Sequence, residues 1–343
     1  MRAMVLERTG EIKSDSEPLR LRDRPKPEPG DGEVRLRVHV CAVCHTELDQ
    51  IEGRVATPLP RVPGHEIIGT VEVAGSEADG DLVGQRVGIG WIGSACGECK
   101  WCRRGEENLC PEFCATGRNI DGGYADFVCV PAHFVHPVPE SLADAQAAPM
   151  LCAGAIGLRS LRLADIDNGQ VLGLTGFGAS NHLVLSLARI LYPASPVMVW
   201  ARDAGQREQA RELGAQWAGD TPETPPEAPD AIIDTTPAWI PVLAALENLA
   251  PGGRLVINAI AKESGDRDRL AELDYEQQLW REKEIKSVAN VTRRDIADYL
   301  KIAAEHGLSP RVQKMPLEQA NDALRRIRFG DFRGAFVLEI NTA

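Results

Sequence analysis

Short apolar runs alternate with amphipathic segments through the middle of this 343-residue chain. Alternation of this kind is typical of a parallel sheet with helices on both faces. It predicts an α/β fold with a doubly wound parallel sheet. The predicted elements, strand and helix in turn, are 170–174, 181–191, 196–200, 206–213, 231–234, 240–249 and 254–257.

The flanking sequence has a different pattern. Residues 33–40 alternate with period two, 67–73 form another short β-run, and Gly and Pro separate such runs up to about residue 140. A small-residue helix is predicted to begin near Ala147, and the final strand at 334–340 has no helix beside it, so we expect it to return to the β-rich part. The predicted domains are 1–150 with 293–343, and 151–292.

Four cysteines stand close together in a polar loop, with the spacing C-x2-C-x2-C-x7-C. Four thiolates surround a tetrahedral zinc ion at about 2.3 Å and leave no open position, which makes such a site structural. Reducing conditions disfavour the alternative of two disulfides, and an iron–sulfur cluster stays a second alternative. We predict a structural zinc lobe at about 93–113. Its ligands are Cys96, Cys99, Cys102 and Cys110.

Three further potential metal ligands are dispersed along the chain. They occur in Cys44-His45-Thr46, in Gly64-His65-Glu66, and as Cys152 near the predicted domain boundary. Taken singly, a buried cysteine is most often a packing residue, and a lone histidine is most often hydrogen-bonded in the core or on the surface. Spacing alone does not join these residues into one site.

Together with the four-cysteine lobe and the strand–turn–helix at 170–191, these motifs resemble the zinc-containing medium-chain alcohol dehydrogenase family over most of the chain. The resemblance implies a GroES-like catalytic domain in the β-rich part and a Rossmann domain in the alternating part. It also implies a catalytic zinc ion held by Cys44, His65 and Cys152 with its fourth position open. Glu66 is implied to coordinate this metal transiently.

The resemblance implies roles for the residues around that zinc. As a Lewis acid, the metal would lower the pKa of the substrate alcohol, and the alkoxide would release hydride readily. Thr46 would accept the alcohol proton, His45 would face the cofactor pyrophosphate, and Glu47 would support a metal ligand. Many members have a histidine where this chain has Asp49. An ordinary carboxylate is a poor proton shuttle at neutral pH unless its environment raises its pKa.

The turn after the 170–174 strand carries an imperfect GxGxxG pattern whose third glycine is replaced by Asn181, which implies a wider helix–strand contact. Gly176 permits the tight turn, and Gly178 lets the backbone approach a pyrophosphate at the helix N-terminus. The alternative is an ordinary glycine turn, but the strand–turn–helix context favours a dinucleotide site. The predicted contacts are Gly176, Phe177, Gly178, Ala179, Ser180 and Asn181.

Cofactor choice depends on the end of the next strand. Ala201 stands where NAD-specific members place a carboxylate, and Arg202 follows it, so a 2′-phosphate meets no repulsion and has a partner. This favours NADP over NAD, although Asp203 is a counterargument because it is near enough for the ribose. Near the C-terminus, Arg333 is expected to contact the cofactor phosphate.

Charge and hydropathy limit the partners. The chain has 38 Lys and Arg against 50 Asp and Glu, a net charge of −12, which disfavours binding to nucleic acid or an anionic membrane. No apolar stretch approaches about 18 residues, and charge appears too early for a signal peptide. We expect a cytoplasmic homodimer or homotetramer with a small alcohol or aldehyde as substrate.

The predicted function is that of a zinc-dependent alcohol dehydrogenase, an oxidoreductase that transfers hydride reversibly between a zinc-bound alkoxide and NAD(P)⁺ and yields an aldehyde or ketone. One alternative is an NADPH-dependent aldehyde reductase of the same family. A second is a non-catalytic, zinc-stabilised binding protein. The presence of all three ligand types and of Thr46 favours an enzyme.

Overall fold

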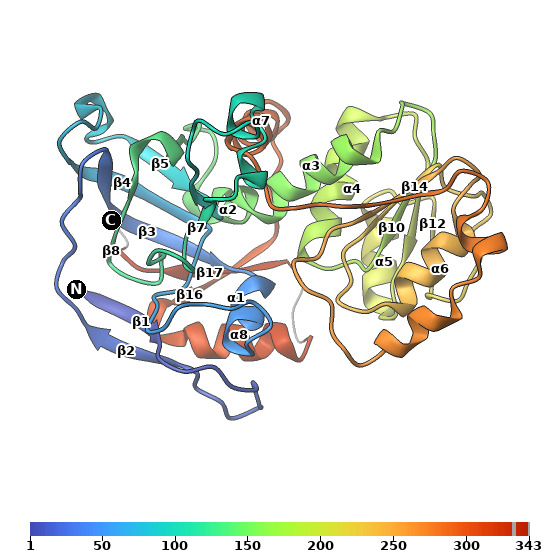
Figure 1. Ribbon diagram of the computed structural model, residues 1–343, viewed down its shortest axis with the longest axis horizontal. Coiled ribbons are helices and arrows are strands. Elements are labelled where there is room, and N and C mark those ends of the chain that lie inside the picture. The colour runs from blue at the N-terminus through green and yellow to red at the C-terminus, as the bar shows by residue number, and fades with distance from the viewer. Residues whose placement is uncertain (331–333, 342–343) are drawn as a thin grey trace. The chain divides into compact units, whose positions relative to one another are not determined.

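The computed structural model describes residues 1–330 and 334–341 (Figure 1). The chain forms two compact units, which are described separately. Unit 1 contains Met1–Ala155 and Asn290–Ala343, and unit 2 contains Ile156–Ala289. Within the described residues, no helix combines the length and apolar content needed to cross a bilayer.

A seven-stranded sheet forms the centre of unit 1. Its order is β16-β17-β3-β4-β5-β9, and β8 also pairs with β3. Two small two-stranded sheets, β1-β2 and β6-β7, lie outside it. The strands are β1 (Arg2–Leu6), β2 (Leu19–Asp23), β3 (Glu33–Val43), β4 (Ile67–Ala74), β5 (Arg86–Ile89), β6 (Ile92–Ser94), β7 (Cys114–Ala115), β8 (Phe127–Pro131), β9 (His136–Pro137), β16 (Val312–Pro316) and β17 (Ala335–Glu339).

The long strand β3 shows why this sheet forms. Its alternating residues Val34, Leu36 and Val38 are buried, as the period-two pattern predicts. The strand continues beyond the predicted end, through Val43, because β17 pairs antiparallel with its last four residues and covers them. The C-terminal strand is therefore part of the same sheet as β3, although about 300 residues separate them in sequence.

The helices of unit 1 frame the sheet. The predicted helix near Ala147 is interrupted: α2 (Asp144–Ala147) runs into a 3-10 turn at Ala148–Leu151, and α3 begins only at Ala153. Pro149 lies at the start of that turn, and Cys152 has non-helical dihedral angles, φ −124° and ψ −74°. The break turns Cys152 out of the helical path. The helices are α1 (His45–Ile51), α2, α3 (Ala153–Ala164, which continues into unit 2), α7 (Arg293–His306) and α8 (Ala320–Arg328).

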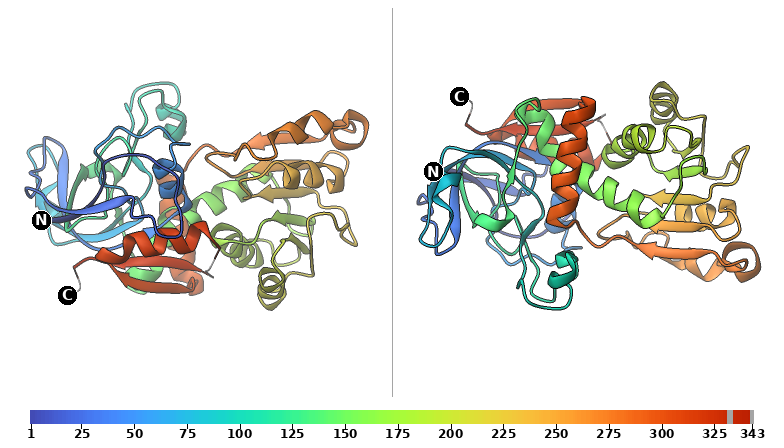
Figure 2. Two further views of the ribbon diagram at one scale, coloured as in Figure 1. Left: turned by 90° about the horizontal axis from the view of Figure 1, so that it is seen from below. Right: turned by 90° about the horizontal axis from the view of Figure 1, so that it is seen from above.

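Unit 2 is a six-stranded parallel sheet in the order β12-β11-β10-β13-β14-β15. Helices cover both faces of this sheet (Figure 2), so the α/β fold class with a doubly wound parallel sheet is confirmed. The elements are β10 (Leu172–Thr175), α4 (Ala179–Leu191), β11 (Val197–Trp200), α5 (Ala204–Glu212), β12 (Trp217–Gly219), β13 (Ala231–Asp234), α6 (Ile240–Asn248), β14 (Arg254–Ile257) and β15 (Glu284–Ser287).

The two edge strands, β12 and β15, are not predicted from the sequence. β12 has three residues, and β15 reads Glu-Ile-Lys-Ser with every residue exposed. Edge strands are often short or charged because unpaired edges promote aggregation, so they lack the continuous apolar run of a central parallel strand.

Candidate active site

Cys44, His65 and Cys152 converge in unit 1. Each offers one ligand atom, and these atoms lie within 4.8 Å of one another; His65 Nε2 is 3.3 Å from Cys152 Sγ. Cys44 is the N-cap of α1, directly after β3; His65 precedes β4; and Cys152 occupies the break before α3. Three loops at one end of the sheet therefore bring together ligands that are 21 and 87 residues apart in sequence.

A fully buried carboxylate, Glu47, orients two of these ligands. Glu47 accepts a hydrogen bond from the Cys44 backbone N–H at 2.8 Å and another from His65 Nδ1 at 2.7 Å. With Nδ1 facing the Glu47 carboxylate, Nε2 is the nitrogen that faces the space shared with the two sulfurs, and it offers its lone pair to a metal ion once it is deprotonated. Burial lowers the pKa of His65, but the Glu47 carboxylate and Cys44 outweigh it and raise this pKa well above its usual value.

The donor set fits a zinc ion. The hydrogen bond from Cys152 holds the pKa of Cys44 well below its usual value despite burial, and the same contact raises the pKa of Cys152. One thiolate is thus favoured even before a cation neutralises the site. Two sulfurs and one imidazole nitrogen are typical of a catalytic zinc site, which has three protein ligands and one open position.

Glu66 is not among the three converging ligands. Its Oε1 accepts a hydrogen bond from the Ala153 backbone N–H at 3.3 Å, and burial, followed by the charge of Cys44, raises its pKa well above the usual value. Trp91 stands edge-on to the His65 ring with 4.8 Å between ring centroids. This indole closes one side of the site with apolar surface.

Thr46, His45 and Asp49 follow Cys44 on α1. Thr46 Oγ1 lies 3.6 Å from Cys44 Sγ, so the hydroxyl is adjacent to the metal ligands. His45 Nε2 lies 4.0 Å from Asp49 Oδ1, and Arg54 Nε donates to the same oxygen at 2.6 Å. Burial raises the pKa of Asp49 against the opposing effects of His45 and Arg54. This is the direction that a proton shuttle at position 49 requires.

The four clustered cysteines also converge, in the lobe between β6 and β7. The Cys96–Cys102, Cys99–Cys102 and Cys96–Cys110 sulfurs are 3.9, 3.6 and 3.5 Å apart. Tetrahedral bonds of about 2.3 Å imply an edge of about 3.8 Å between sulfurs, so the spacing suits one zinc ion. The Cys96 backbone N–H donates a hydrogen bond to Cys110 Sγ at 3.4 Å.

The glycine turn of unit 2 connects β10 to α4. Gly176 adopts φ +75°, which favours glycine, and a Cβ on Gly178 would meet no protein atom within 4 Å. That open space at the helix N-terminus suits a pyrophosphate. Asn181 takes the place of the third glycine: its buried Nδ2 donates to the carbonyls of Thr175 and Gly176 at 3.0 and 2.7 Å. The Asn181 side-chain amide thus connects helix α4 to the glycine turn. Phe177 is buried, Ser180 is half-buried, and Ala179 begins α4.

The residues that follow β11 are those on which the cofactor hypothesis depends. Ala201 is buried directly after the strand, and Arg202 is exposed. The Asp203 side chain caps α5 and accepts a hydrogen bond from the Gln206 backbone N–H at 2.8 Å. The other predicted cofactor residue, Arg333, lies outside the described residues.

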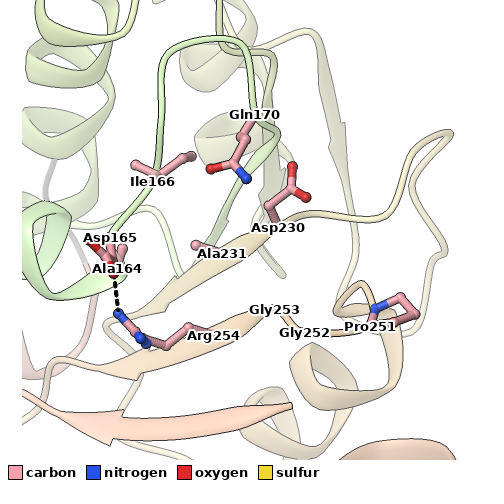
Figure 3. Close-up of a pocket in the computed structure, with 10 residues that line it drawn as sticks. All are labelled: Ala164, Asp165, Ile166, Gln170, Asp230, Ala231, Pro251, Gly252, Gly253 and Arg254. Atoms are coloured by element: carbon pink, nitrogen blue, oxygen red, sulfur yellow. Dashed lines mark ion pairs between the residues drawn. The ribbon is translucent and has the colours of Figure 1, made fainter. Parts of the chain in front are cut away.

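A cavity of about 220 Å³ lies at the amino ends of the unit 2 strands, at the opposite end from the glycine turn (Figure 3). Its lining residues precede β10, β13 and β14 or begin β13 and β14, and Arg254 extends to Asp165 at 3.4 Å. Ligands of open parallel sheets bind outside the carboxyl ends of the strands, so this cavity at the amino ends is not the cofactor site.

Comparison with known proteins agrees with this geometry. Residues 30–140 match the family described as "Alcohol dehydrogenase GroES-like domain". The chain is 42% identical to "Probable alcohol dehydrogenase AdhA" of Mycobacterium tuberculosis, covering 88% of this chain and 87% of that one. It is 31% identical to an alcohol dehydrogenase of Geobacillus stearothermophilus, with 96% and 98% covered. A cinnamyl alcohol dehydrogenase structure from Sorghum bicolor matches with a TM-score of 0.83 and 26% identity, covering 98% and 97%.

The chain belongs to the zinc-dependent medium-chain dehydrogenase/reductase family, to which the alcohol dehydrogenases belong. It is an oxidoreductase of the CH–OH class with a small-molecule substrate, and it uses zinc and a nicotinamide nucleotide.

The position of Glu47 leads to a prediction about metal binding. The Glu47→Gln substitution removes the charge that orients His65, so it should weaken zinc binding at Cys44, His65 and Cys152 by about 10–100-fold. The rate and extent of zinc transfer to a chromogenic chelator measure this. The four-cysteine group is the internal control, because its zinc should be released as in the unsubstituted protein. The prediction would be contradicted if the zinc at Cys44, His65 and Cys152 were released at the same rate and to the same extent in the variant as in the unsubstituted protein.

Proposed function

We propose that the protein is a zinc-dependent alcohol dehydrogenase that catalyses alcohol + NAD(P)⁺ ⇌ aldehyde or ketone + NAD(P)H + H⁺. The observation that carries the proposal is the convergence of two thiols and one imidazole, oriented by Glu47, with no fourth protein ligand among the described residues. A zinc ion at this position supplies Lewis acidity, which lowers the pKa of a substrate hydroxyl. A second zinc ion, held by the four-cysteine lobe, is structural.

The chain's own residues would then carry the proton of the substrate hydroxyl to solvent. The Thr46 hydroxyl, beside the metal ligands, accepts the hydrogen of the substrate alcohol at Oγ1 and passes on its own. His45 and Asp49, one turn apart on α1, provide the next titratable groups on the way to solvent. Glu66 would be able to coordinate the metal transiently, since the one hydrogen bond to its carboxylate found among the described residues is the 3.3 Å contact from the Ala153 backbone N–H.

We propose NADP as the preferred cofactor. Arg202 is exposed directly after β11, no carboxylate stands at position 201, and the next carboxylate along the chain, Asp203, is the cap of α5. A guanidinium in this position pairs with a 2′-phosphate, and one oxygen of the Asp203 carboxylate is already used as the acceptor of the helix cap.

A homodimer or homotetramer is proposed on the basis of unit 2. Strand β15 leaves one edge of the parallel sheet unpaired in the chain, and Tyr275, Trp280 and Ile285 near it are 64%, 59% and 46% exposed. Unpaired edges with apolar side chains favour association. The proposed location is the cytoplasm, because all nine cysteines are free thiols and six of them belong to the two ligand groups.

The experiment that tests the function joins a metal analysis to an activity panel. The purified protein should contain about two zinc ions per chain and should reduce NAD(P)⁺ in the presence of some alcohols of a panel. Turnover confined to aldehydes with NADPH would favour the reductase alternative. One zinc ion per chain and no turnover with any alcohol or aldehyde would leave the binding protein as the better account.

Arg202 provides the test of cofactor preference. The Arg202→Ala substitution should lower kcat/KM for NADP⁺ by about tenfold or more, since a charge-assisted hydrogen bond contributes about 1.5–3 kcal/mol. The value for NAD⁺ should stay within about twofold. Arg294→Ala, which removes an exposed arginine of unit 1, is the matched control. A higher kcat/KM for NAD⁺ than for NADP⁺ in the unsubstituted enzyme would refute the preference.

Asp49 provides the test of the proton path. Because burial raises its pKa, the pH profile of kcat/KM should show an ionisation that Asp49→Asn removes and Asp49→His moves toward neutral pH. Activity of the Asn variant should fall mostly on the acidic-to-neutral limb, where alcohol oxidation needs a base. Identical profiles in all three proteins would exclude Asp49 from the path.

A further inference from the structure

A buried ion pair lies at the carboxyl edge of the unit 2 sheet. Asp234, the last residue of β13, is fully buried, and Lys262, after β14, has a side chain only 9% exposed. Lys262 Nζ lies 2.5 Å from Asp234 Oδ2. Burying two charges costs solvation free energy that their attraction often fails to exceed, so such a pair is weak evidence for a stabilising role. The position of this ion pair in the fold indicates a role other than stabilisation.

Lys262 has no hydrogen left for a ligand. Besides Asp234, its ammonium donates to the backbone carbonyl of Thr236 at 2.7 Å and to that of Ala238 at 3.0 Å. An ammonium group has three donors and no acceptor. Lys262 therefore acts on the segment 235–238 and does not bind a phosphate.

Asp234 connects this segment to the glycine turn. Its Oδ1 accepts hydrogen bonds from Thr175 Oγ1 at 2.7 Å and from Thr236 Oγ1 at 2.8 Å. Thr175 directly precedes Gly176, and a Cβ on Gly176 would lie 2.9 Å from Thr236 Cγ2. One carboxylate thus holds the end of β10 and the segment that packs against the turn.

We propose that Lys262 and Asp234 are positioning residues for the dinucleotide: they hold Thr235–Ala238 against the Gly176 turn and thereby set the affinity of unit 2 for the cofactor. The inference rests on the proposed function, in which that turn receives the pyrophosphate. Without Lys262, the buried carboxylate of Asp234 has no countercharge, and segment 235–238 loses the donor that fixes two of its carbonyls. Segment 235–238, which packs against the Gly176 turn, is then free to shift.

Direct titration of the zinc-loaded full-length protein with NADH and NADPH, followed by nucleotide fluorescence, tests the proposal. Lys262→Met should raise the Kd of the preferred nucleotide by about tenfold. The double variant Lys262→Met/Asp234→Asn removes the unpaired buried charge and keeps an oxygen acceptor for the two threonines, so its Kd should be lower than that of Lys262→Met. The Kd should stay above the unsubstituted value, because the carbonyls of Thr236 and Ala238 still lack the Lys262 donor. Zinc content should be the same in all of them.

Lys283→Met is the matched control. The Lys283 ammonium also donates to two backbone carbonyls, those of Leu246 and Gln277, at 2.7 and 3.0 Å. It precedes β15 and so lies at the amino edge, away from the glycine turn. Its loss tests whether any such lysine of unit 2 affects nucleotide binding, and the Kd should stay within about twofold.

An unchanged Kd in Lys262→Met overturns the proposal. A loss of affinity that the double variant does not relieve, with a weaker salt dependence, assigns Lys262 to phosphate binding and overturns it as well. Should Lys262→Met not fold, Asp234→Asn alone decides: a raised Kd with unchanged zinc content supports the proposal, and an unchanged Kd refutes it. If the unsubstituted protein binds neither nucleotide, the proposed function fails first.

Discussion

The hydrogen bond between Glu47 and His65 is the contact on which the metal site depends. A carboxylate without exposure to water is costly unless it is paired, and here its partners are a histidine that must present its other nitrogen and the backbone of a cysteine ligand. The two hydrogen bonds that offset the cost of burying Glu47 thus also orient two metal ligands, Cys44 and His65. Cys152 needs no such support because the break before α3 positions it.

Acid–base contacts with a buried carboxylate occur beside three of the loops described above. Asp49 is paired with Arg54 beside the metal site, Asp234 with Lys262 beside the glycine turn. Glu107 in the cysteine lobe accepts hydrogen bonds from both the backbone N–H and Nε of Arg293 at the start of α7. Such pairs add little net stability compared with apolar packing, but they permit only a narrow range of geometries. Loops that carry chemistry are the parts of a fold that need this restriction most.

The fold class and the convergence of the metal ligands could both be predicted from the sequence, but for different reasons. The strands at 231–234 and 254–257 are buried in a parallel sheet, so their apolar runs are continuous and their ends are clear. Cys44, His65 and Cys152 were joined by a family resemblance, since no local spacing relates them. Arg54 and Lys262 were missed because each acts through a contact created by tertiary structure. Nothing in the segment around Lys262 distinguishes it from the other charged residues of a polar loop.

Asn181 shows why a motif that departs from the family pattern can keep its function. The third glycine of the fingerprint allows close packing of helix against strand, and a side chain there should push the two apart. In this chain the side chain is an amide short enough to remain buried, and its Nδ2 donates to the two carbonyls at the end of β10 and in the turn. The cost of added volume is offset by two hydrogen bonds to groups that a glycine leaves for water or ligand. The turn is therefore held from the helix side by Asn181 and from the sheet side by Asp234, which leaves the space over Gly178 open while its borders are fixed.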